Sequence, residues 1–208
     1  MSFFTQRKLN KLQQAVIEGD LTRLNKPFYK LDQARLIEPS FDYQGTPCNL
    51  PELAILAGQA NALAHLIQAG CDLSASLAEP LLYQAMRHPQ QSLALMTVLL
   101  QADIPLNYPE QNPSHALFAC FRLCPAKQLM LHLSRLNEYG ADLNVRDIEG
   151  NTALILALQL DHKPLVQMLI NSGAQLPEEL PEQLCGEEII GYAQRLADDL
   201  RIRQLMLG

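Results

Sequence analysis

Cysteine and histidine are the residue types in this chain that could bind a metal or act as nucleophiles, and their spacing favours neither role. The five cysteines lie at positions 48, 71, 120, 124 and 185 of the 208 residues, without a CxxC pair. A zinc site needs four ligands, usually supplied as two close pairs. Cys120 and Cys124 share one face of a helix, with His115 and His132 nearby in the sequence, but a second spaced pair is missing. We interpret the cysteines as buried thiols of a reducing compartment and expect no metal site.

Catalytic signatures are also missing from the sequence. It contains no GxSxG, no HExxH and no phosphate-binding GxxxxGK[ST] motif. Carboxylate pairs could act as general acid and base, but Glu178–Glu179, Glu187–Glu188 and Asp198–Asp199 are adjacent residues that point in different directions around a helix. We therefore expect no catalytic residues, no cofactor and no enzymatic activity.

The charge pattern argues against nucleic acid as a partner. The formal net charge is −6, and residues 31–176 carry seven bases and thirteen acids. Nucleic-acid binding draws most of its affinity from Lys and Arg side chains that neutralise phosphates. The only basic cluster lies within residues 1–30, where six bases face two acids, and we interpret it as a solvated helix face.

Hydropathy gives no sign of a membrane segment. A span requires about 20 consecutive apolar residues, whereas the apolar run Ala153–Leu158 is six residues long. The first residues, Phe3–Lys8, lack the apolar stretch of a secretory signal. The expectation is a soluble cytoplasmic protein without a membrane partner.

One phrase recurs along the chain and predicts the fold. Each copy begins with a leucine, has a glycine-type position four residues later and a second leucine three residues after that, and the glycine-type position falls at 70, 103, 140 and 173. The steps between copies are 33, 37 and 33 residues. Such spacing is typical of stacked supersecondary units, each of which buries its apolar face only against its neighbours.

The best copy shows what one unit contains. Residues 151–160 predict a short helix that is apolar on most faces, with Ala157 small where neighbouring helices approach. Pro164 suits the first turn of a second helix, and Gly173 suits its left-handed end. Residues 147–157, DIEGNTALILA, followed by Val166, Leu169–Ile170 and Gly173–Ala174, resemble the ankyrin repeat, D-x-x-G-x-T-P-L-H-x-A with a later V-x-x-L-L-x-x-G-A.

The resemblance is best over residues 147–176 and weaker over about 10–146. It implies an all-α, ankyrin-type solenoid of about five helix-turn-helix repeats with capping helices at both ends. We expect a single domain over residues 1–208, with a divergent first repeat and N-terminal cap at 1–40, repeats at 41–176 and C-terminal capping helices at 177–208. In the fourth unit Cys120 occupies the small alanine position, and four residues are inserted around Pro125.

The resemblance also implies the function, which is recognition of a protein partner through the concave face and loop tips by a monomeric module. An alternative is a scaffolding or regulatory subunit that binds or dimerises through its acidic C-terminal helix, and a third is an enzyme with an unrecognised site. In ankyrin repeats, the variable positions at the loop tips and the ends of the first helices contact the partner. The corresponding positions of this sequence are the candidate protein-binding residues: Tyr43, Ser76, Leu77, Met86, Arg87, Tyr108, Glu110, Gln111, Asn112, Phe121, Arg122, Ile148, Glu149, Asn151 and Gln159.

Overall fold

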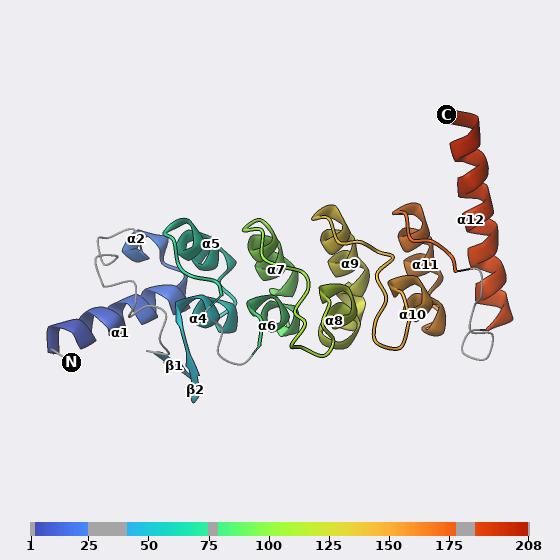
Figure 1. Ribbon diagram of the computed structural model, residues 1–208. Helices are drawn as coiled ribbons and strands as arrows, with labels where there is room; N and C mark the ends of the chain where they lie inside the picture. Colours follow the sequence, from blue (N-terminus) through green and yellow to red (C-terminus); the bar gives the residue numbers. More distant parts are fainter. Residues whose placement is uncertain (1–2, 25–40, 75–78, 178–185, 208) are drawn as a thin grey trace.

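Figure 1 shows the computed structural model, in which pairs of helices stand side by side in one row. The structure describes residues 3–24, 41–74, 79–177 and 186–207. Its elements in chain order are α1 (Phe3–Glu18), α2 (Leu21–Leu24), β1 (Phe41–Tyr43), β2 (Thr46–Cys48), α4 (Leu50–Leu56), α5 (Ala60–Gln68), α6 (Leu81–Arg87), α7 (Ser92–Leu100), α8 (Ala116–Leu123), the 3-10 turn η2 (Ala126–Gln128), α9 (Leu129–Glu138), α10 (Ala153–Gln159), α11 (Lys163–Asn171) and α12 (Glu187–Leu207).

The helices form two layers. The first helices of successive pairs, α4, α6, α8 and α10, lie in one layer, and their partners α5, α7, α9 and α11 lie in the other (Figure 1). Contacts run within each pair and from each pair to the next, as between α4 and α6 or α5 and α7. This is the predicted all-α solenoid, and α1–α2 packs on α4 and α5 as a first, divergent pair.

Small residues at one repeated position allow the first helices to approach closely. Ala54, Ala85, Cys120 and Ala157 occupy this position in α4, α6, α8 and α10, and all four are fully buried. The burial of Ala157 and Cys120 is what the interpretation of this position as a packing site between repeats requires. A larger side chain there would force the helices apart, because protein interiors are close-packed.

Side chains cap the helix starts. The Asn49 side chain accepts from the Glu52 N–H at 2.9 Å, and the Glu52 carboxylate accepts from the Asn49 N–H at 2.9 Å, which makes a capping box at α4. Thr152 caps α10 through Ile155 N–H, and His162 caps α11 through Leu165 N–H. Each cap satisfies an amide that the first turn of a helix leaves without a partner.

The predicted helix ends are present as well. Gly173 has φ +100°, the left-handed conformation in which glycine pays no Cβ penalty. Asp103 occupies the same position after α7 with φ +53°, and aspartate is among the few residues that tolerate this region. The repeat phrase therefore marks the ends of the second helices, including the copy that lacks glycine.

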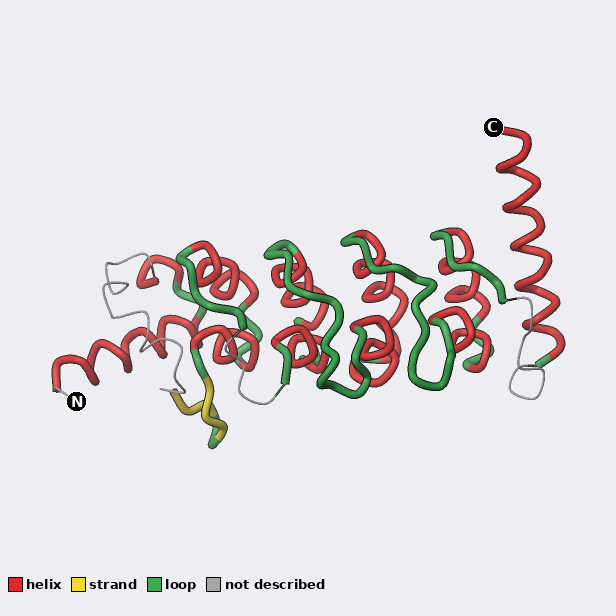
Figure 2. Tube along the Cα trace, in the orientation of Figure 1, coloured by secondary structure: helices red, strands yellow, loops and turns green. Residues whose placement is uncertain are grey.

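A small hairpin adds strands to a fold predicted from sequence as all-α. β1 and β2 pair antiparallel with Phe41 opposite Cys48 and Tyr43 opposite Thr46. Between them Gln44 and Gly45 have φ +54° and +85°, the two positive values of the turn that best matches the twist of a hairpin. Figure 2 shows the hairpin at the edge of the stack where the connections between pairs also lie.

The four extra residues of the fourth unit are shared between its helices and their connection. Relative to the pair α10–α11, helices α8 and α9 are each one residue longer, at eight and ten residues against seven and nine. The other two lengthen the connection, which runs from Cys124 to Gln128 and contains η2. The prediction of an insertion around Pro125 is therefore correct, and its local effect is an extra turn.

The two ends of the stack differ. At the start, Arg7, Lys8, Lys11 and Arg23 are exposed, the polar outer face expected of a terminal repeat. At the other end α12 stands against α11 and continues beyond it (Figure 1). Ile189 and Ala193 are buried there, whereas Ile202, Leu205 and Met206 are exposed. The first half of α12 is thus a cap, and the predicted helix at 178–184 lies outside the described residues.

Among the described helices, none combines the length and apolar character needed to cross a bilayer.

Candidate protein-binding groove at the loop tips

A groove of about 600 Å³ opens where the third and fourth connections meet the end of α8. Its walls come from the loop at 109–114, from the last two turns of α8, from the loop at 147–149 and from one residue of α10. We call it the loop-tip groove, and it is lined by Pro109, Gln111, Asn112, Pro113, Ser114, Phe118, Phe121, Arg122, Asp147, Ile148, Glu149 and Leu156.

The loop that forms the first wall is held by backbone pairing. Tyr108 N–H donates to Ser114 O at 2.6 Å, and Ala116 N–H donates to Leu106 O at 2.8 Å. The Tyr83 hydroxyl of α6 donates to Pro113 O at 2.8 Å, and its ring lies edge-on to Tyr108 with centroids 5.1 Å apart. Burial raises the pKa of Tyr108 to about 12. The loop is therefore tied to the preceding repeat and presents a fixed wall.

The α8 wall begins at a histidine cap. His115 Nδ1 accepts from Leu117 N–H at 3.2 Å, so this nitrogen must carry no proton. Burial lowers the pKa of His115, against the opposing effect of Asp142, and so favours the neutral ring that the cap requires. The ring lies edge-on to Phe118, with centroids 6.1 Å apart, and Phe121 follows one turn later.

The third wall is a tight turn organised by one carboxylate. Asp147 accepts from the N–H groups of Glu149 and Asn151 at 2.9 and 2.8 Å. Asn151 also donates through its side chain to Asp147 and Glu149, at 3.3 Å in each case. This turn pushes Ile148 outward, and its side chain is 85% exposed. An isoleucine so exposed on a fixed turn is available for contact.

The chemistry of the groove suits docking of a polypeptide. Phe118, Phe121 and Leu156 give it an apolar floor, while Arg122 and Glu149, both exposed, place opposite charges on its rims. An apolar centre with a polar rim is the usual anatomy of a protein interface. In the described part of the chain there is no group of three or more His, Cys, Asp and Glu side chains that could hold a metal ion.

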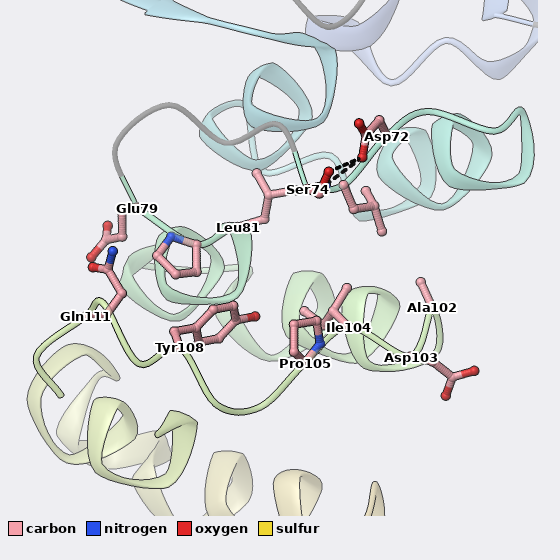
Figure 3. Close-up of a pocket in the computed structure, with 12 residues that line it drawn as sticks. Asp72, Ser74, Glu79, Leu81, Ala102, Asp103, Ile104, Pro105, Tyr108 and Gln111 are labelled. Carbon is pink, nitrogen blue, oxygen red and sulfur yellow. Dashed lines mark hydrogen bonds between the residues drawn. The ribbon is translucent and has the colours of Figure 1, made fainter. Parts of the chain in front are cut away.

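A second pocket of about 580 Å³ lies beside this groove, between the second and third connections. Figure 3 shows Tyr108 in its centre, Glu79 and Gln111 at one end and Asp103 at the other. Asp72 Oδ1 accepts from the hydroxyl and the N–H of Ser74 at 2.7 and 2.8 Å, and these bonds lower the pKa of Asp72. Gln111 lines both pockets, so the two form neighbouring parts of one edge.

Six of the residues predicted from sequence meet in the loop-tip groove, namely Gln111, Asn112, Phe121, Arg122, Ile148 and Glu149. Others lie elsewhere. Arg87 is exposed and pairs with Glu79 at 2.6 Å, Gln159 is exposed at the end of α10, and Tyr43 is half-buried in β1. Glu110 is exposed on the same loop as the groove, and Asn151 is half-buried in the turn of the third wall, where it bonds to Asp147. Ser76 and Leu77 lie outside the described residues.

Met86 is wrong as a surface contact. Its side chain is fully buried, and its Sδ lies 4.0 Å from Cys120 Sγ in the next repeat. This contact places Met86 between α6 and α8, where methionine fills irregular gaps.

The groove also contains residues that the sequence pattern did not single out. Pro109 and Pro113 frame the loop, Phe118 precedes Phe121 by three residues, and Leu156 reaches in from α10. The spacing of the two phenylalanines could have indicated this in the sequence, because residues three apart share a helix face.

Known proteins resemble this chain in sequence over one repeat and in fold over most of its length. The ankyrin repeat model matches residues 149–178. Solved structures similar to this chain include the ankyrin repeat domain of Bcl-3, described as a unique member of the IκB protein family (TM-score 0.66, 20% identity, 90% of this chain and 85% of that chain). They also include an ankyrin repeat domain from Acinetobacter baumannii AYE (0.58, 20%, 94% and 95%) and the ankyrin repeat protein EF0377 (0.57, 19%, 92% and 96%). No curated protein matches the chain.

The class is therefore a helical repeat solenoid. Residues 149–178 are an ankyrin repeat, and the chain as a whole has the ankyrin-repeat fold, which confirms the resemblance predicted from its sequence.

Proposed function

We propose that this chain is a non-enzymatic, monomeric, cytoplasmic binding module whose protein partner docks at the loop-tip groove. Ankyrin repeats generally serve as protein-interaction modules. The observation that carries the proposal is the placement of Ile148, 85% exposed, beside the half-buried Phe121 in a groove flanked by Arg122 and Glu149. Such a site suits a partner segment with an apolar side chain for the floor and charged residues on either side.

The proposal predicts that Ile148→Asp weakens partner binding about 30-fold or more. A central interface residue commonly contributes 2 kcal/mol or more, and a charge at this position would be buried against the apolar side chain of the partner without a counter-charge. The fold should be unaffected because the side chain is exposed. The measurement is quantitative mass spectrometry of proteins captured on the immobilised full chain, followed by titration of the captured partner.

The matched control is Leu131→Asp on α9, which puts the same charge on a residue 52% exposed in the other layer. We expect this variant to bind like the parent. If the partner still binds Ile148→Asp but no longer binds Leu131→Asp, the binding surface lies on the second helices and the proposal is refuted.

The free end of α12 favours a second candidate function. Ile202, Leu205 and Met206 are 53%, 78% and 82% exposed, and they lie three and four residues apart on one face of the helix. Exposed apolar residues in this pattern are typical of a helix that binds a partner or a second copy. Leu205→Asp should abolish binding or self-association under this alternative, and leave both unchanged if the loop-tip groove is the site.

A further inference from the structure

The cap of α8 differs in chemistry from the caps of α4 and α10. Those two first helices are capped by Asn49 and Thr152, whose side chains do not change charge with pH. At the equivalent position α8 has His115, whose Nδ1 accepts from Leu117 N–H at 3.2 Å. A backbone N–H can only donate, so Nδ1 must be the acceptor. An imidazole loses this acceptor when it binds a proton, and the cap of α8 therefore requires a neutral His115.

Protonation of His115 acts on the start of α8 in two ways. The new Nδ1–H faces the Leu117 N–H, so two donors meet and the amide loses its acceptor. The positive charge also lies at the N-terminal end of a helix, where the helix dipole is unfavourable to cations. Both effects favour a ring that leaves the cap and a first turn that frays.

The first turn of α8 also carries part of the loop-tip groove. Phe118 lines the groove, and its ring lies edge-on to His115 with centroids 6.1 Å apart. The loop at 109–114, which forms the first wall, is tied to the same turn because Ala116 N–H donates to Leu106 O at 2.8 Å. A change at His115 therefore reaches two walls of the groove.

The surroundings of His115 favour its neutral form at neutral pH. Burial lowers the pKa of His115 below its ordinary value of 6.5, and this effect exceeds the opposing effect of the Asp142 carboxylate in the connection after α9. The other ionisable groups on α8 and on the elements packed against it have contacts of their own or are exposed. They are, with their contacts, Arg87 of α6 (Glu79), Tyr83 of α6 (Pro113 O and the Tyr108 ring), Arg135 of α9 (Glu138) and His132 of α9 (Gln128 O and Ser92 Oγ), together with the exposed Glu110 and Arg122.

We propose that His115 is an acid-sensitive switch of the loop-tip groove, which is competent to bind while the ring is neutral and is weakened when the ring is protonated. In mildly acidic solution a proton adds to Nδ1, the bond from Leu117 N–H is lost, and Phe118 is no longer held in place. The effect on a partner rests on the docking function proposed above. The switch itself is a property of the chain without a partner.

The first test is an NMR titration of the full chain without a partner, from pH 8 to pH 4.5. It follows the His115 ring and the backbone amide of Leu117. We expect the two to change together with a midpoint below pH 6.5, because burial lowers the pKa of His115. The Ile155 amide is the internal control, because it donates to the Thr152 hydroxyl at 3.3 Å and this acceptor does not titrate.

The second test is the variant His115→Thr, which copies the cap of α10 and removes the titrating ring. The histidine of the unfolded chain binds a proton with a pKa near 6.5, whereas the folded cap resists protonation, so stability is lost as the pH falls below 6.5. From pH 7.5 to pH 5, the unfolding equilibrium constant should rise more in the parent than in His115→Thr, by up to about 30-fold. His115→Asn, which copies the cap of α4, should behave like His115→Thr.

Two further histidine caps are shared by the proteins compared. His88 Nδ1 accepts from Gln91 N–H at 2.9 Å, and His162 Nδ1 accepts from Leu165 N–H at 3.1 Å. Because both caps remain in parent and variant, their contribution to the pH dependence cancels. The same comparison applies to binding of the captured partner. Between pH 7.5 and pH 5.5 its affinity should fall at least fivefold more for the parent than for His115→Thr.

Three results would overturn the switch. One is a Leu117 amide that keeps its chemical shift while the His115 ring titrates, which needs no variant. Another is an equal pH dependence of unfolding in the parent and in His115→Thr. The third is a partner affinity that falls equally in both proteins. These results leave the docking proposal intact, whereas a partner that binds Ile148→Asp as tightly as the parent refutes docking and leaves the titration of the cap unaffected.

Discussion

Ala157→Asp is expected to remove most of the stability of this protein. Ala157 is fully buried at the position where α10 meets the neighbouring repeat, and an aspartate there would be a buried charge without a partner. Such a charge costs several kcal/mol, against a total stability of about 5–15 kcal/mol for a typical domain. Urea unfolding followed by circular dichroism should show a transition at far lower denaturant, or no cooperative transition.

The control for this variant is Gln159→Asp, two residues further along α10 and exposed. The same charge there should change the free energy of unfolding by about 0.5 kcal/mol or less, as is usual at the surface. Equal midpoints for the two variants would mean that the face of α10 assigned to the repeat contact is wrong.

The second large effect is expected at the C-terminal end. Ile189→Asp should destabilise the protein by several kcal/mol, because Ile189 is buried in the half of α12 that packs on α11. Polar contacts beside it, between Lys163 and Glu188 and between Gln167 and Tyr192, hold α12 to the last repeat. Without the cap, the apolar face of α11 would meet water, and we expect a lower melting temperature together with aggregation on heating.

Ile202→Asp makes the matched comparison on the same helix. It replaces the same residue type by the same charge, but Ile202 is 53% exposed beyond the stack. Its melting temperature should lie close to that of the parent. If Ile202→Asp destabilises the monomer as much as Ile189→Asp does, then the second half of α12 is also structural. The division of α12 into a packed cap and a free end would then be wrong.

The repeat architecture was predictable because it depends on local chemistry that recurs. The phrase around Gly173 combines the end of an apolar helix with a residue in the left-handed conformation. Each copy repeats these two features at a similar spacing. Even Asp103 keeps the left-handed conformation, with φ +53°. The small position occupied by Ala157 and Cys120 followed from the same alignment, since close helix packing limits side-chain size.

The features that could not be predicted depend on contacts between repeats. Met86 occupies a surface position by its place in the pattern, yet the approach of α8 buries it against Cys120. The loop-tip groove needs the loop at 109–114 and the turn at 147–149 to meet, although they lie more than thirty residues apart. The buried hydrogen bonds of Ser92 with Gln128 and His132 likewise join α7 to η2 and α9, and in the sequence only the insertion around Pro125 lies near them.

The claim that a protein partner docks at the loop-tip groove is tested most directly by site-specific crosslinking. A photoreactive benzoylphenylalanine is placed at Ile148 in one protein, at Leu131 on α9 in a second and at Leu205 on α12 in a third, because all three side chains are exposed. After irradiation with the captured partner, we predict a covalent adduct from position 148 alone. An adduct from position 131 or 205, with none from 148, would contradict the claim.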